Sequence, residues 1–112
     1  MVNAYKLDSM IKGWFIGPFL PAVFKTDQFE CAVKRYAAGD REPAHVHRVA
    51  TEFTVIVEGS VRMNGQTYIR NSILEIAPGD ATDFEALTDV ITFVVKIPAV
   101  QGDKYLIEST HD

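Results

Sequence analysis

The sequence predicts a single all-β domain with a sandwich or barrel architecture. Short runs rich in valine, isoleucine, threonine and aromatic residues recur between turn signals, which is typical of all-β domains. Helical segments between these runs, which would predict a βαβ fold with a parallel sheet, do not occur. The length of 112 residues fits one domain that can bury a genuine core.

The composition is that of an ordinary globular protein, with 47% hydrophobic and 23% charged residues. A formal charge of −4 offers no broad attraction to nucleic acid or to anionic membranes, so neither is expected as a partner. Cys31 is the single cysteine, which excludes an intramolecular disulfide. No run approaches the roughly 20 apolar residues of a membrane-spanning helix, and the first residues do not read as a signal peptide. We therefore expect a cytoplasmic protein.

Residues 1–28 form an N-terminal arm in this interpretation. One short helix is possible within residues 1–12, where apolar residues recur at helical spacing before Gly13 ends the pattern. Residues 14–24 mix aromatic side chains with glycine and proline, which favours short kinked extended pieces or an edge strand. We expect these aromatics to pack in the core or at a subunit interface, and on that basis we predict a homodimer.

The central region, about residues 29–97, contains the clearest strand patterns. The expected strands are 29–34, 41–47, 53–57, 61–63, 66–70, 73–76, 82–85 and 90–97. Asn64-Gly65 is the strongest hairpin signal, because both residues tolerate the positive φ angles of a type I′ turn. The run 90–97 is apolar on both faces and is expected to be a central strand.

The C-terminal tail, residues 98–112, follows a proline that stops the last central strand. Residues 105–107 could add one edge strand. The end of the tail is polar and contains His111, which we expect in a frayed segment.

The main candidate site consists of His45, His47 and Glu52. Side chains alternate along a strand, so the two histidines share one face. Four residues separate His47 from Glu52, enough for a bend that returns the carboxylate toward the imidazoles. Such a set can hold a divalent transition metal such as iron, manganese, zinc or nickel. The alternative is a polar pocket in which the histidines hydrogen-bond to Glu52 or to water.

The same residues carry a resemblance to a known family. Gly39, His45, His47, Glu52 and Gly59 match every fixed position of the first cupin motif, glycine-x5-His-x-His-x(3,4)-Glu-x6-glycine. The chain therefore resembles a small single-domain cupin spanning residues 1–112. This resemblance implies a double-stranded β-helix, the cupin jelly roll, often with a metal inside the barrel.

The second cupin motif, glycine-x5-Pro-x-Gly-x2-His-x3-Asn, is degraded. Aligned on Gly79, the sequence has Asn71 at the first glycine, Ala77 at the proline, Thr82 at the histidine and Ala86 at the asparagine. The histidine that usually completes a four-ligand site in the family is missing. Asp83 could replace it if the strand register shifts by one, since only one of Thr82 and Asp83 can face inward.

Two functions remain open. The resemblance allows a metal-dependent enzyme of the dioxygenase, isomerase, epimerase or lyase type, acting on a small molecule. The alternative is a non-catalytic module that binds a sugar or an acid without metal. Arg41 or Arg48 could hold an anionic ligand, and Tyr36 or Tyr68 could offer a hydroxyl, although solvation and packing are the simpler roles. Cys31 lacks the partners of an activated nucleophile and fits a small core residue.

Overall fold

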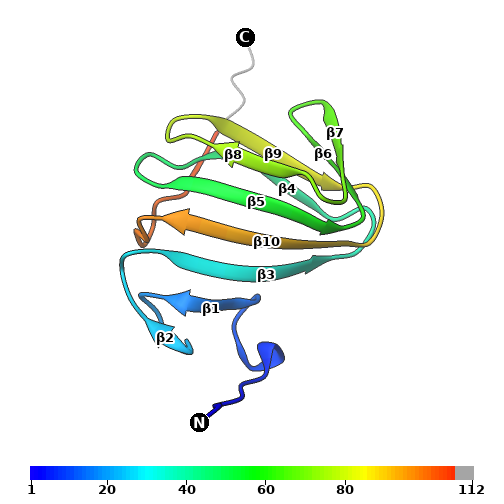
Figure 1. The fold of residues 1–112 in the computed structure, drawn as a ribbon. Coiled ribbons are helices and arrows are strands. Elements are labelled where there is room, and N and C mark those ends of the chain that lie inside the picture. The colour runs from blue at the N-terminus through cyan, green and yellow to red at the C-terminus, as the bar shows by residue number, and fades with distance from the viewer. Residues whose placement is uncertain (108–112) are drawn as a thin grey trace.

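A computed structural model describes residues 1–107 of the chain, and His111 lies outside the described residues. Two β-sheets face each other (Figure 1). The first runs in the order β2 (Phe24–Lys25), β1 (Trp14–Gly17), β3 (Glu30–Tyr36), β10 (Val90–Ile97), β5 (Thr51–Glu58) and β8 (Ile73–Ile76). The second runs in the order β11 (Tyr105–Leu106), β4 (Arg41–Val46), β9 (Ala81–Ala86), β6 (Ser60–Met63) and β7 (Gln66–Ile69). The predicted all-β class is confirmed.

Strand β10 is central, as its apolar pattern predicted. It pairs antiparallel with β3 on one side and with β5 on the other, so both of its edges are hydrogen-bonded. The other pairs of strands are also antiparallel, except that β1 and β2 are parallel. The expected hairpin joins β6 to β7, and Asn64 and Gly65 have φ angles of 51° and 79°.

The N-terminal arm contains one turn of 3-10 helix, Leu7–Ser9, which confirms the short helix as a single turn. The aromatics that follow are only partly exposed: Trp14 meets Phe19 edge to face, and Phe15 lies against Phe93 of β10. Phe24 remains largely exposed. No helix within residues 1–107 is long and apolar enough to cross a membrane.

The tail returns to the fold as the predicted edge strand. β11 pairs antiparallel with the end of β4, where Leu106 lies opposite His45. Residues 98–104 therefore pass close to the segment that carries the two histidines.

The interior is divided along the strands into an apolar end and a polar end. The apolar end is a cluster of buried side chains from both sheets: Ile56, Val61, Met63, Ile76, Phe84, Ala86 and Val90. With the period of two along a strand, the same inward face continues to Glu52 on β5, Thr82 on β9 and Lys96 on β10. The core thus fills one end of the barrel and leaves polar groups at the other.

Candidate metal centre

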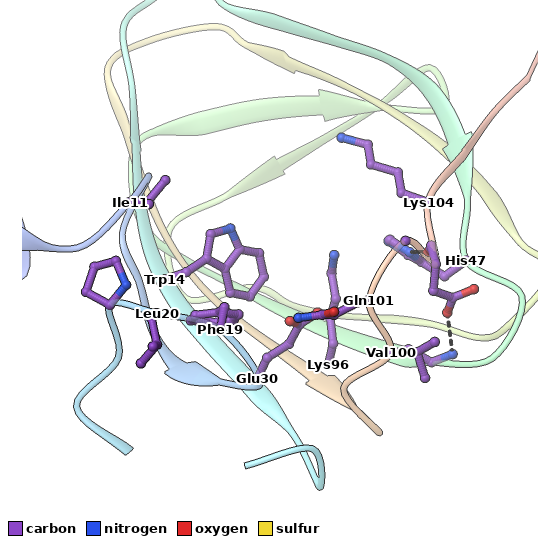
Figure 2. Close-up of a pocket in the computed structure, with 14 residues that line it drawn as sticks. Ile11, Trp14, Phe19, Leu20, Glu30, His47, Lys96, Val100, Gln101 and Lys104 are labelled. Carbon is purple, nitrogen blue, oxygen red and sulfur yellow. Dashed lines mark hydrogen bonds between the residues drawn. The ribbon is translucent and has the colours of Figure 1, made fainter. Parts of the chain in front are cut away.

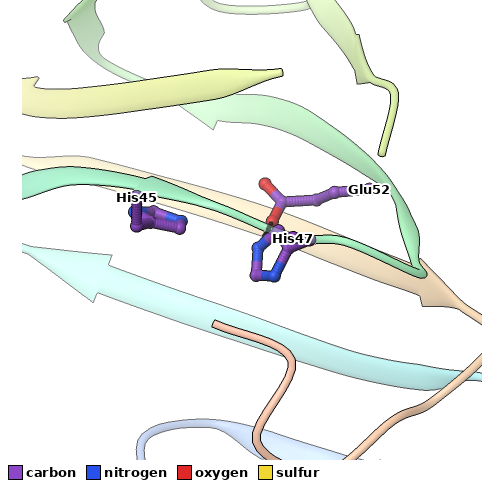
Figure 3. A group of neighbouring side chains, drawn as sticks. All are labelled: His45, His47 and Glu52. Atoms are coloured by element: carbon purple, nitrogen blue, oxygen red, sulfur yellow. Dashed lines mark ion pairs between the residues drawn. The ribbon is translucent and has the colours of Figure 1, made fainter. Parts of the chain in front are cut away.

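His45, His47 and Glu52 converge at the polar end of the barrel (Figure 3), and we call this group the candidate metal centre. His45 lies near the end of β4, His47 follows that strand, and Glu52 comes from the start of β5. One possible ligand atom from each residue lies within 4.8 Å of those of the other two. Both histidines are buried, and His47 is only 4% exposed.

Backbone carbonyls define the tautomers of both imidazoles. Nδ1 of His45 lies 3.2 Å from the carbonyl oxygen of Pro43, and Nδ1 of His47 lies against the carbonyl oxygen of Asp103. A carbonyl can only accept a hydrogen bond, so each Nδ1 carries the proton in a neutral ring. Each Nε2 is then left with a free lone pair, the arrangement found in metal-binding histidines.

The Nε2 atom of His47 tests whether a metal fits. It lies 3.3 Å from Oε1 of Glu52, is buried, and makes no hydrogen bond to any described residue. A nitrogen lone pair facing a carboxylate oxygen is repulsive unless a cation or a proton lies between them. A divalent metal would accept both groups as ligands, so the donor set fits such an ion.

The ionisation states of the other two candidate ligands, Glu52 and His45, are those that a metal needs. Burial raises the pKa of Glu52, but the neighbouring His47 and a 2.7 Å hydrogen bond from the Thr54 hydroxyl outweigh it and hold that pKa below its usual range. Burial lowers the pKa of His45, although its contact with the Pro43 carbonyl opposes this effect. An ionised carboxylate and a neutral imidazole are therefore favoured at neutral pH.

Asp103 anchors the turn that carries His47. Its buried carboxylate accepts hydrogen bonds from the backbone N–H groups of Arg48, Val49 and Ala50, at 2.9, 3.1 and 2.9 Å. Burial raises the pKa of Asp103, but these three donors outweigh it and lower the pKa overall. Sequence reasoning missed this residue, because nothing in the pattern of the tail indicates that it packs against the histidines.

The two residues considered for the missing fourth ligand have different surroundings. Thr82 lies directly opposite His45 in the pairing of β4 with β9. Asp83 is exposed, and its carboxylate accepts a 2.7 Å hydrogen bond from the backbone N–H of Asn64. Among the described residues, the group of candidate metal ligands does not contain Asp83.

Two spaces adjoin the candidate metal centre. A cavity of about 340 Å³, here called the outer cavity, is lined in part by Trp14, Phe19, Leu20, His47, Lys96 and Lys104 (Figure 2). A smaller space of about 60 Å³, the inner hollow, is lined by His45, Glu52, Thr82 and Thr92 among others. Trp14, Lys96 and Lys104 border both, so the two spaces meet beside the candidate metal centre.

Lys96 is a second residue that sequence reasoning missed. It lies on the same face of β10 as the buried residues Val90, Thr92 and Val94, and its Nζ lies 5.0 Å from the centre of the Trp14 ring. The sequence did contain a signal for Lys96. Side chains alternate along a strand, so residue 96 lies on the same inward face as residues 90, 92 and 94 of the most apolar run.

The other residues considered from the sequence have local partners. Arg41 pairs with Glu85 at 3.1 Å, and the guanidinium of Arg48 lies 3.9 Å from the centre of the Tyr105 ring. Neither arginine lines the outer cavity or the inner hollow. Tyr68 donates its hydroxyl to Gln66.

Tyr36 and Cys31 have structural surroundings. The Tyr36 ring packs 4.5 Å from that of Phe84, and its hydroxyl donates to Glu42 at 3.2 Å while bordering the inner hollow. Burial and the nearby Glu42 raise the pKa of Tyr36 well above its usual range. Cys31 is buried in β3, and burial raises the pKa of its thiol, which fits a core residue.

No protein-family model matches the sequence, and no curated protein matches it either. Solved structures do match in three dimensions. An uncharacterised protein with a double-stranded β-helix domain from Klebsiella pneumoniae superposes with a TM-score of 0.70 at 17% identity, covering 97% of this chain and all of the other. A DMSP lyase from Ruegeria pomeroyi gives 0.71 at 17% identity, over 88% of this chain and 52% of that chain.

A third match names the superfamily. A sugar phosphate isomerase of the cupin superfamily from Silicibacter pomeroyi gives a TM-score of 0.58 at 20% identity, over 62% of this chain and 50% of that chain. The protein has the cupin fold. The double-stranded β-helix expected from the first motif is confirmed.

Within this cupin fold, the glycine positions of the two motifs have positive φ angles, and this holds even where another residue replaces glycine. Gly39, Gly59 and Gly79 have φ angles of 93°, 89° and 90°. Asn71, which replaces the first glycine of the second cupin motif, has a φ angle of 75°. Asparagine tolerates the left-handed region better than most residues, so the turn survives the substitution.

Proposed function

We propose that the protein binds a divalent transition metal through His45, His47 and Glu52 and acts on a small molecule that enters through the outer cavity. The single observation that carries the proposal is the buried Nε2 of His47, which faces Glu52 without a hydrogen bond. Iron, manganese, zinc and nickel all accept such ligands.

A bound metal would supply Lewis-acid polarisation of a ligand oxygen. The protein's own residues would orient that ligand: Trp14 offers an apolar wall, Lys96 offers a cation, and the inner hollow offers threonine hydroxyls. The matching structures include proteins named as a lyase and as an isomerase. These names favour lyase or isomerase chemistry as the first reactions to assay, with oxygen consumption as the separate test for a dioxygenase.

Metal analysis of protein purified without an affinity tag tests the proposal. We expect one metal ion per chain, or one bound on addition of zinc, and loss of that ion in His47→Ala and Glu52→Gln. Glu75→Gln is the matched control, because Glu75 is exposed on the neighbouring strand β8. Unchanged metal content in both ligand variants would disprove the assignment. Absence of any metal binding would leave the metal-free binding module as the better reading.

We also propose a homodimer. The exposed apolar residues Leu20 and Phe24 lie near the sheet edge formed by β2, where a second copy could cover them. Light scattering at high protein concentration tests this proposal, and a monomer there would contradict it.

A further inference from the structure

The outer cavity contains a cation without a close acidic partner. None of the ion pairs within 4.0 Å among the described residues includes Lys96. Its side chain is partly buried and extends into the cavity beside Trp14 (Figure 2). A partly buried ammonium retains hydrogen-bond donors that water or a ligand must satisfy.

Lys96 differs in this respect from its neighbour Lys34. The ammonium of Lys34 lies 3.6 Å from Glu42, and 5.8 Å from the centres of both the Trp14 and Tyr36 rings. Lys34 is therefore already paired. The strand neighbours of Lys96 include two carboxylates, Glu30 on β3 and Glu52 on β5.

Metal binding would change the balance of charge around Lys96. If Glu52 is a metal ligand, a divalent cation more than neutralises its charge. The carboxylate of Asp103 is already occupied by three backbone N–H groups. Lys96 then faces Glu30, its partner on β3, as its remaining acidic neighbour, and these two residues form none of the ion pairs within 4.0 Å in the described part of the chain.

A second lysine approaches the same space from the tail. Lys104 follows Asp103, lines both the outer cavity and the inner hollow, and extends toward the cavity in Figure 2. Lys104 also belongs to none of the ion pairs found within residues 1–107. Two ammonium groups from separate elements thus border the passage between the two spaces.

Most of the remaining lining of the outer cavity is apolar, although Glu30, Gln101 and Asp103 also line it. The apolar part is formed largely by the arm and the tail, with Ile11, Trp14, Phe19, Leu20 and Val100. A volume of about 340 Å³ is within the range of small-molecule sites. The cavity therefore combines a largely apolar surface with two lysines next to the candidate metal centre, and the carboxylate of Glu30 is the acidic lining group that is not held by backbone N–H groups.

We infer that the outer cavity binds a small organic anion, with its carboxylate or phosphate group at Lys96 and Lys104 and its apolar part against Trp14. This inference names the ligand class of the proposed metal centre and rests on that proposal. The affinity for the anion should rise when the metal is bound, because the metal removes the competing charge of Glu52.

Trp14 makes the inference measurable, since it is the only tryptophan of the chain and lies in the cavity wall. Its fluorescence can be followed while zinc-loaded protein is titrated with phenylacetate, with the neutral phenylacetamide and with phenyl phosphate. We expect phenylacetate to bind about tenfold or more tightly than phenylacetamide, as a charge-assisted hydrogen bond would provide. Tighter binding of phenyl phosphate than of phenylacetate would identify phosphate as the preferred anionic group.

The carboxylate of phenylacetate could also bind the zinc ion directly, so a preference for the acid does not by itself show that the lysines bind it. Substitution of Lys96 separates these two modes of binding. In Lys96→Met we expect about a tenfold loss of affinity for phenylacetate and little change for phenylacetamide. Lys25→Met is the matched control, because Lys25 is exposed on β2 and does not line the cavity, and both affinities should stay unchanged. If circular dichroism shows that Lys96→Met does not fold, Lys104→Met gives the same test at an exposed residue.

The outcomes separate this inference from the proposed function. Equal binding of the acid and the amide, or an unchanged preference in the lysine variants, overturns the inference even if calorimetry shows that zinc binds. If zinc does not bind to the wild type, the proposed function fails. A preference for the acid that disappears in Lys96→Met without metal would still support an anion site.

Discussion

Nδ1 of His47 lies against the backbone carbonyl of Asp103, a residue 56 positions later in the chain. The carboxylate of Asp103 also accepts three backbone N–H groups from the turn that follows His47. One residue of the tail therefore orients the imidazole and holds its turn. Such indirect support of a metal ligand commonly affects affinity as much as tenfold to a hundredfold.

Asp103→Ala should lower zinc affinity by about tenfold or more, because the turn that follows His47 loses the carboxylate that anchors it, while the backbone carbonyl that contacts His47 remains. Stability should also fall by about 1–3 kcal/mol, since backbone donors lose their acceptor. Calorimetry with zinc and urea unfolding measure the two effects. Asp89→Ala is the control. The Asp89 carboxylate accepts a 3.0 Å hydrogen bond from the backbone N–H of Ala38, in the loops that follow β3 and precede β10. Its loss should leave zinc affinity unchanged. Unaltered zinc affinity in Asp103→Ala would show that the Asp103 carboxylate does not position His47.

Zinc affinity should depend on pH through the histidines. Metal binding needs neutral imidazoles, and burial lowers the pKa of His45 from the ordinary value of 6.5. We expect affinity to change little between pH 8 and 7. It should then fall by about tenfold per pH unit for each histidine that becomes protonated. Calorimetric titration across this range checks the prediction, and an affinity that is the same at pH 8 and pH 5 would contradict it.

At neutral pH the metal-free wild-type protein should be less stable than the Glu30→Gln variant, in which the carboxyl group is replaced by a neutral amide of the same shape. Burial raises its pKa above the ordinary value of 4.5, although Lys96 and His47 oppose the shift and Asp103 and Glu52 add to it. The folded state therefore binds a proton more readily than the unfolded state, so this group's contribution to stability rises as pH falls through the raised pKa toward 4.5. Glu30→Gln lacks this dependence.

Urea unfolding of the wild type and of Glu30→Gln at pH 7.5 and 5.5 tests whether the contribution of Glu30 to stability rises as the pH falls. The variant should be the more stable protein at pH 7.5, and its advantage should shrink at pH 5.5. A variant that is less stable at both pH values would mean that the charge of Glu30 stabilises the fold through Lys96.

The two glycines that bound the first cupin motif should differ in their tolerance of alanine. Both have positive φ angles, a conformation that costs roughly 1–2 kcal/mol with a side chain. A Cβ at Gly59 would also lie 2.2 Å from the carbonyl oxygen of Asp89, whereas a Cβ at Gly39 would meet no atom within 4 Å. Gly59→Ala should therefore lose about 1–3 kcal/mol more than Gly39→Ala in urea unfolding. Equal losses would show that the backbone near Asp89 moves aside.

Local sequence determined most of the strands and the three candidate ligands. An apolar run on both faces predicted β10 as central, because a strand that is paired on both edges and covered on both faces needs apolar residues throughout. The short spacing from His45 to Glu52 predicted their convergence, because one strand and one turn suffice to bring them together. These are short-range constraints, and a sequence pattern can express them.

Only the tertiary structure decided what surrounds those ligands. Asp103 and Lys104 reach the site because the tail crosses the end of β4, and Trp14 reaches it because β1 joins the edge of β3. Lys96 is placed by its register with Glu30 and Glu52 on two different strands. Contacts between residues so distant in the chain depend on sheet order and register, which the pattern of one segment does not specify.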